Sequence, residues 1–85
     1  MPDEILDEKK ITPKEAAEAA SKFYREATGE YSHVSLEEVE FKEGYWYVTL
    51  GIERNALIYG QKDYKIFKVN AKTAYVESMT VKSVR

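Results

Sequence analysis

The chain has 85 residues and a mass of 9.8 kDa, which is enough for one small domain and too little for two. Hydrophobic residues make up 44% of it and charged residues 33%, a composition typical of folded chains. The absence of cysteine excludes disulfides and cysteine-ligated metals, and the single histidine excludes a multi-histidine metal site within one chain. The apolar runs are too short to cross a membrane, and the N-terminus lacks the features of a signal peptide. We therefore expect a cytoplasmic protein with no membrane partner.

The net charge of −2 conceals an asymmetry along the chain. Residues 1–60 carry a net charge of −6, whereas residues 61–85 carry +4. A basic C-terminal hairpin is able to attract an acidic partner or phosphates. The alternative is that these lysines lie on an exposed strand face and discourage aggregation between sheet edges.

The N-terminal part of the sequence predicts an arm followed by a helix. Residues 1–10 are acidic and polar, which indicates a flexible arm, and residues 11–85 form the single domain. Thr12 and Glu15 fit a capping box, with Pro13 at the first helical position. We expect the helix to run to about Thr28 and to end at Gly29. Its apolar stripe consists of Ala16, Ala20, Phe23 and Ala27, widened by Ala17 and Tyr24, with Phe23 as the main side chain that enters the core.

After Tyr31 the apolar residues follow a period of two, which is typical of strands. The alternation changes phase at Glu37–Glu38, which indicates a β-bulge or a late strand start. A tight turn at Glu43–Gly44 leads into a strand over Tyr45–Glu53, whose two faces are clearly distinct. One face carries Trp46, Val48, Leu50 and Ile52, and the other carries Tyr45, Tyr47, Thr49 and Gly51.

Two further strands are expected over residues 63–69 and 75–84, joined by a turn at 70–74. The predicted fold is therefore α+β, with one α-helix packed on a four-stranded antiparallel β-meander. The predicted core consists of Ala16, Ala20, Phe23, Trp46, Val48, Leu50, Ile52, Ile66, Met79 and Val81.

The acidic residues and the histidine offer little support for chemistry. Glu37, Glu38, Glu40 and Glu43 form an acidic patch, in which Glu38 and Glu40 would share a strand face and are able to hold a hard cation such as calcium. We favour a solvated strand face opposite the later lysines, because no recognisable ligand loop is present. His33 lies beside Ser32, but sequence neighbours rarely have the geometry of a catalytic triad. We predict no catalytic residues, no metal site and no cofactor.

Two apolar features indicate a surface that binds another protein. Tyr45 and Tyr47 lie on the strand face that a single helix cannot cover, and tyrosine offers a large contact area at low entropy cost. The alternative is that these tyrosines only stabilise the sheet as cross-strand pairs. The segment that contains Leu57, Ile58 and Tyr59 is apolar although a loop is expected there. It either extends the flanking strands, folds under the sheet, or forms a partner contact or a homodimer seam. The alternative partner is nucleic acid, bound weakly by Lys65, Lys68 and Lys72 in the basic hairpin.

The sequence resembles PepSY-like domains at two places. Ile11–Ala17 is similar to the start of their helix, and Tyr64–Val76 is similar to their final hairpin. This chain has Asn70 where an aspartate is usual and Ala74 where a glycine is usual. The resemblance covers nearly all of residues 11–85 and implies an inhibitory or protein-interaction module without catalysis, of a kind that is often secreted or membrane-attached.

The same layout is similar to the small gas-vesicle accessory proteins of the O type. The matching features are Phe23 ahead of Thr28-Gly29, Trp46-Tyr47-Val48 leading to Glu53-Arg54, and the Arg85 ending. This resemblance implies a cytoplasmic role in assembly. Both families imply the same fold.

Overall fold

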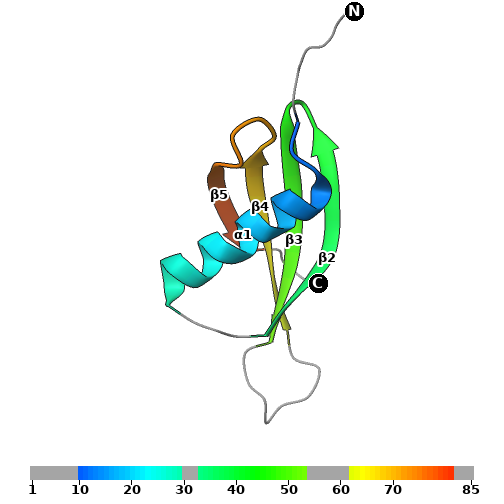
Figure 1. The fold of residues 1–85 in the computed structure, drawn as a ribbon. Helices are drawn as coiled ribbons and strands as arrows, with labels where there is room; N and C mark the ends of the chain where they lie inside the picture. Colours follow the sequence, from blue (N-terminus) through cyan, green and yellow to red (C-terminus); the bar gives the residue numbers. More distant parts are fainter. Residues whose placement is uncertain (1–9, 30–32, 54–61, 82–85) are drawn as a thin grey trace, which may run out of the picture.

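The computed structural model describes residues 10–29, 33–53 and 62–81. These residues form one helix and four strands: α1 (Pro13–Thr28), β2 (His33–Lys42), β3 (Tyr45–Glu53), β4 (Lys62–Asn70) and β5 (Val76–Val81). The strands form a single antiparallel sheet in the order β2-β3-β4-β5. The helix crosses one face of this sheet diagonally, and no described element covers the other face (Figure 1). The predicted α+β fold is confirmed.

The ends of α1 lie where the sequence predicts them. The Glu15 amide donates to the Thr12 hydroxyl at 3.1 Å, and the Thr12 amide donates to the Glu15 carboxylate at 2.8 Å, so the capping box is complete. Gly29 has a φ of +72°, in the left-handed region, and its N–H donates to the carbonyl of Arg25 at 2.8 Å. Both ends are therefore fixed by local interactions that the sequence encodes within a few residues.

The hairpin of β2 and β3 contains both irregularities that the sequence predicts. Glu43 and Gly44 have φ values of +52° and +86°, as the two central residues of a type I′ hairpin turn require. The pairing between the two strands shifts between Leu36 and Glu38, which leaves Glu37 as the extra residue of a β-bulge. The bulge restores the phase of the alternation, so the apolar residues on both sides of it face the helix.

The core lies between α1 and the central strands. Its buried apolar residues are Ala16, Ala20, Tyr24, Trp46, Val48, Leu50, Ile52, Phe67, Val69 and Ala71. The four predicted core residues of β3 are all among them. The alanines of the helix allow its axis to approach the sheet closely, so the larger side chains of β3 and β4 fill most of the volume.

The prediction of Phe23 as the main helical core residue is wrong. Tyr24 is buried instead, one turn after Ala20 in the same row of the helix, whereas Phe23 is partly buried with its ring edge-on to Phe67 at 6.3 Å. Ala27 is exposed, because the last turn of α1 projects beyond the strands (Figure 1). The buried residues of the helix are therefore Ala16, Ala20 and Tyr24, and the face that they form is rotated about the helix axis from the predicted apolar stripe.

The prediction of Ile66 as a core residue is also wrong. Residues directly opposite one another in antiparallel strands share a face of the sheet. Phe67 lies opposite Val48 and therefore faces the helix, whereas Ile66 lies opposite Thr49 and belongs to the other face. The apolar residues of β4 that enter the core are Phe67 and Val69.

Met79 and Val81 face the helix side, as predicted, but they are not core residues. Met79 lies opposite Phe67 and Val81 lies opposite Lys65, so both point to the face that carries α1. They are nevertheless 36% and 72% exposed, because β5 is an edge strand and the helix packs mainly on β3. Residues 82–84, which we expect to continue this strand, lie outside the described residues, as does most of the predicted arm.

Lys10 and Ile11, which precede α1, contact the sheet near the two turns that the structure describes. Ile11 donates its N–H to the carbonyl of Ala71 at 2.8 Å and accepts the indole N–H of Trp46 at 3.0 Å. The ammonium of Lys10 lies 4.0 Å from the centre of the Phe41 ring. Lys10 and Ile11, which lie at the predicted boundary between the arm and the domain, therefore belong to the folded domain.

Candidate functional site

The face of the sheet opposite α1, which we call the open face, carries the predicted tyrosines. Strand alternation places Trp46 and Val48 under the helix, so Tyr45 and Tyr47 lie on the opposite side. Both tyrosines are partly buried by their neighbours in the sheet. Each of the two residues is therefore accessible in part.

On the open face, an acidic residue of β2 and a basic residue of β4 lie on either side of a tyrosine of β3. Glu40, Tyr47 and Lys68 lie opposite one another on β2, β3 and β4, so an acidic and a basic residue flank the tyrosine. The ammonium of Lys68 lies 4.3 Å from the centre of the Tyr45 ring, in cation–π contact. Glu40 and Tyr47 of this row also line a depression, together with Glu38, Lys42, Thr49 and Ile66. The surface thus offers aromatic area between charges of opposite sign.

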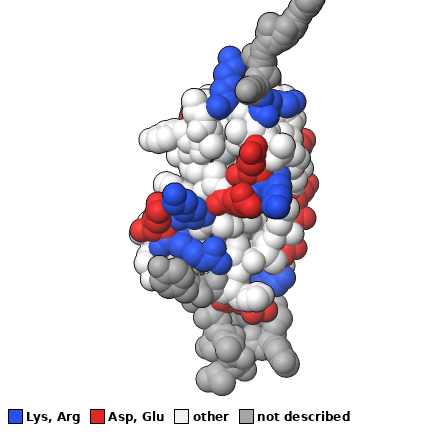
Figure 2. Space-filling model, in the orientation of Figure 1, with Lys and Arg blue, Asp and Glu red and all other residues white. Residues whose placement is uncertain are grey.

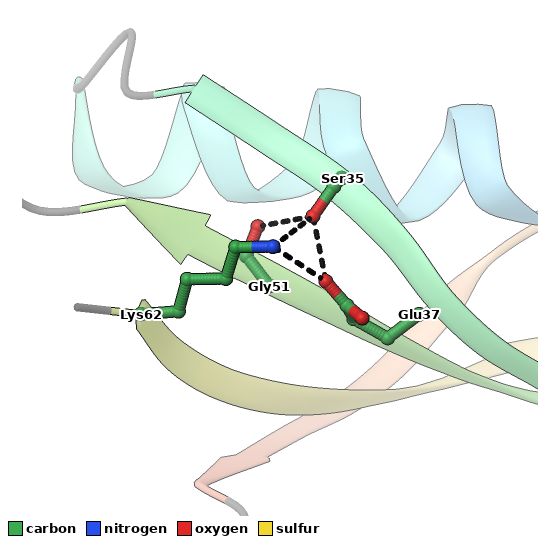
Figure 3. A network of polar contacts seen from close by, with 4 residues as sticks. All are labelled: Ser35, Glu37, Gly51 and Lys62. Atoms are coloured by element: carbon green, nitrogen blue, oxygen red, sulfur yellow. Dashed lines mark hydrogen bonds and ion pairs between the residues drawn. The ribbon is translucent and has the colours of Figure 1, made fainter. Parts of the chain in front are cut away.

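A polar network lies on the same face, over Gly51 (Figure 3). The Ser35 hydroxyl donates to the Glu37 carboxylate at 2.7 Å and lies 3.4 Å from the carbonyl of Gly51. The ammonium of Lys62, on β4, donates to the same Glu37 oxygen at 3.1 Å and to the Ser35 hydroxyl at 3.3 Å. Three strands are therefore joined by side chains that cross over the glycine.

This network changes the proton affinity of both its charged groups. The hydrogen bond from Ser35, and then the one from Lys62, lower the pKa of the Glu37 carboxyl below its ordinary value of 4.5. The hydrogen bond to Glu37 raises the pKa of the Lys62 ammonium above its ordinary value of 10.5. Both shifts favour the charged forms, so the pair is ionised at neutral pH.

Sequence reasoning missed this network. Its one signal is a glycine within a strand, which often marks a place where another group approaches the backbone closely. A Cβ added at Gly51 would lie 2.5 Å from the Glu37 carboxylate and 3.1 Å from the Ser35 hydroxyl. The glycine therefore leaves the space that the Glu37 side chain occupies.

The structure separates the lysines that we expected to act together. Lys65 lies opposite Leu50 and faces the helix side, whereas Lys68 lies opposite Tyr47 on the open face. Lys72 is exposed in the turn between β4 and β5. The three residues do not form one basic surface. The other predicted contact residues, Leu57, Ile58 and Tyr59, lie outside the described residues.

The residues considered for chemistry do not converge within the described ranges. His33 is exposed at the start of β2, opposite Glu53. In residues 10–29, 33–53 and 62–81 there is no group of three or more histidine, aspartate or glutamate side chains able to hold a metal ion. Within that part of the chain, the feature of the open face that offers most to a ligand is its combination of aromatic area and charge.

The fold and this surface define a helix-on-meander α+β domain with an open sheet face. Comparison with known proteins adds no closer assignment, since no family model, curated protein or solved structure matches the chain. In the described part of the chain, no helix is sufficiently long and apolar to span a membrane.

Proposed function

We propose that this domain is a non-catalytic protein-interaction module that binds a partner protein through its open face. The observation that supports this most directly is the row Glu40, Tyr47 and Lys68, together with Tyr45 beside it. Partly exposed tyrosines supply contact area and hydroxyl groups, and flanking charges of opposite sign orient a partner. The predicted apolar segment with Leu57, Ile58 and Tyr59 is proposed as a second part of the same contact.

The two resemblances suggest the setting in which such a module acts. A PepSY-like module would bind and regulate another protein, whereas a gas-vesicle accessory protein would bind a component of the vesicle during assembly. In both cases the domain would act by binding another protein and would not catalyse a reaction. We propose a cytoplasmic location for it.

The experiment is affinity capture of the tagged protein from its native cytosol, with mass spectrometry of the bound material at low and moderate salt. The affinity of the partner identified is then measured for Tyr47→Ala and for Phe41→Ala. Phe41 is a matched control, because it is an aromatic residue that is 41% exposed and lies opposite Trp46, on the helix side of the sheet. We expect Tyr47→Ala to weaken binding at least tenfold and Phe41→Ala to leave it unchanged.

Two results would contradict the proposal. Equal affinities for Tyr47→Ala and Phe41→Ala would show that the open face is not the contact surface. Recovery of nucleic acid that is released by moderate salt would favour the alternative function, since affinity for phosphates falls steeply with salt. In that case Lys68→Glu and Lys72→Glu should weaken binding more than Tyr47→Ala does.

A further inference from the structure

Among the described residues, the large apolar side chains that remain exposed are concentrated at the two edges of the sheet. Leu36 and Phe41 belong to β2, and Tyr75, Met79 and Val81 belong to β5 or directly precede it. In Figure 2 the surface at the upper left, over β5, is largely without charged residues, whereas charged residues of both signs cover the exposed side of the helix. The exposed apolar residues at the β5 edge therefore have few charged residues around them on this face.

The edge at β2 is protected against pairing with another strand. The bulge at Glu37 interrupts its ladder, and charged residues follow it at Glu38, Glu40 and Lys42. Both features are devices by which natural sheets prevent edge-to-edge association. Antiparallel pairing of β2 with β2 of another copy would also place glutamates close to glutamates.

The edge at β5 lacks this protection over most of its length. Its extra residue, Glu77, lies at the start of the strand, and from Ser78 to Val81 the pairing with β4 is regular. These four residues carry no charge. Among the described residues no strand pairs with the outer side of β5, so its outward N–H and C=O groups are able to accept another strand.

We propose that the strand added at this edge is β5 of a second copy of the chain, paired antiparallel across a two-fold axis. An antiparallel pair of identical strands satisfies such an axis, and the interface closes after two copies. The pairing would bring Met79 and Val81 of each copy against those of the other, on the side of the sheet that carries the helices. The product is a continuous eight-stranded sheet with both open faces accessible.

This inference uses a surface separate from the one in the proposed function and stands independently of it. If both hold, the dimer presents two partner-binding faces on one rigid sheet. A partner that is itself repeated would then be bound with higher avidity than by either face alone.

The first test is the mass of the protein in solution, measured by light scattering and sedimentation from 1 to 500 μM. We expect the mass of a dimer that dissociates on dilution. Val81→Lys should shift this dissociation to concentrations at least tenfold higher, because it places a cation at the two-fold contact. Leu36→Lys is the matched control, since Leu36 is 49% exposed on the other edge strand, and it should leave the equilibrium unchanged. Thermal unfolding of both variants confirms that they are folded.

The second test locates the interface by distance. The chain has no cysteine, so a single spin label is introduced at Ser78→Cys in β5 or at Glu40→Cys in β2. With neighbouring strands about 4.8 Å apart, labels at residue 78 should lie within about 20 Å of each other, and those at residue 40 at least about 34 Å apart. A monomer at every concentration would overturn the proposal. So would a dimer in which Leu36→Lys, rather than Val81→Lys, weakens association, or in which the labels at residue 40 are the closer pair.

Discussion

Gly51 and Glu37 occupy one space on the open face: the Glu37 carboxylate lies where a side chain of residue 51 would begin. Glu37 reaches this position because it is the extra residue of the bulge in β2, and Lys62 and Ser35 hold it there. The glycine at position 51 and the additional residue at position 37 thus depend on each other, because the first leaves the space that the second fills.

The Glu37 pair should stabilise the fold in a pH-dependent manner. Because the pKa of Glu37 is lower in the folded protein, its contribution to stability is present above pH 4.5 and is lost as the pH falls through the folded pKa. Glu37→Gln should therefore lower the midpoint of urea unfolding at pH 7 and have little effect once Glu37 is protonated. Unfolding curves of both proteins between pH 2 and 7 measure this. A difference that is constant over this range would contradict it.

Gly51→Ala should remove the effect of Glu37 on stability. The added methyl group displaces the Glu37 carboxylate, whose flexible side chain is able to move away at modest cost. In the Gly51→Ala background, Glu37→Gln should therefore no longer change the unfolding midpoint at pH 7. A full effect of Glu37→Gln in that background would show that the carboxylate keeps its partners without the glycine.

Phe67→Ala and Ile66→Ala should differ strongly although the two residues are adjacent. Phe67 is fully buried under the helix, so its truncation should cost about 3–5 kcal/mol of unfolding free energy. Ile66 is partly exposed on the open face, and its truncation should cost about 1 kcal/mol. Urea unfolding at pH 7 compares them. Costs in the reverse order would mean that β4 presents its other face to the helix.

Thr12→Ala should destabilise the protein by about 1 kcal/mol, because the Glu15 amide loses its side-chain acceptor at the start of α1. Thr12→Ser keeps a hydroxyl at the same position and should recover most of this loss. Denaturant unfolding of the two variants provides the measurement. Equal destabilisation by alanine and serine would show that the hydroxyl is not the stabilising group.

Local interactions explain which parts of the fold the sequence predicts well. Thr12 and Glu15 fix the start of the helix within one turn, and Glu43–Gly44 fix a hairpin with two residues. Along β3, apolar residues alternate with tyrosine, threonine and glycine, so only one face can enter the core. The bulge is visible as a change of phase at Glu37–Glu38.

The errors occur where the local pattern permits two answers. In β4, Ile66 and Phe67 are adjacent and both apolar, so alternation alone does not decide which of them faces the helix. The pairing with β3 decides it, and that pairing depends on residues almost twenty positions away. The same register separates Lys65 from Lys68. The contact between Glu37 and Lys62 joins residues 25 positions apart and could not be predicted from either neighbourhood.

The bulge in β2 also has a consequence for the length of the chain. On both sides of Glu37 the pairing with β3 is regular, and Leu36 and Glu38 already lie opposite the consecutive residues Leu50 and Thr49. If residue 37 were deleted, all the pairs between β2 and β3 would keep their present register. Strand β2 would then continue without a bulge. Glu37 is thus the position of β2 where the protein can lose one residue while each remaining side chain keeps its face. Such a shortened chain would have a straighter, less protected edge.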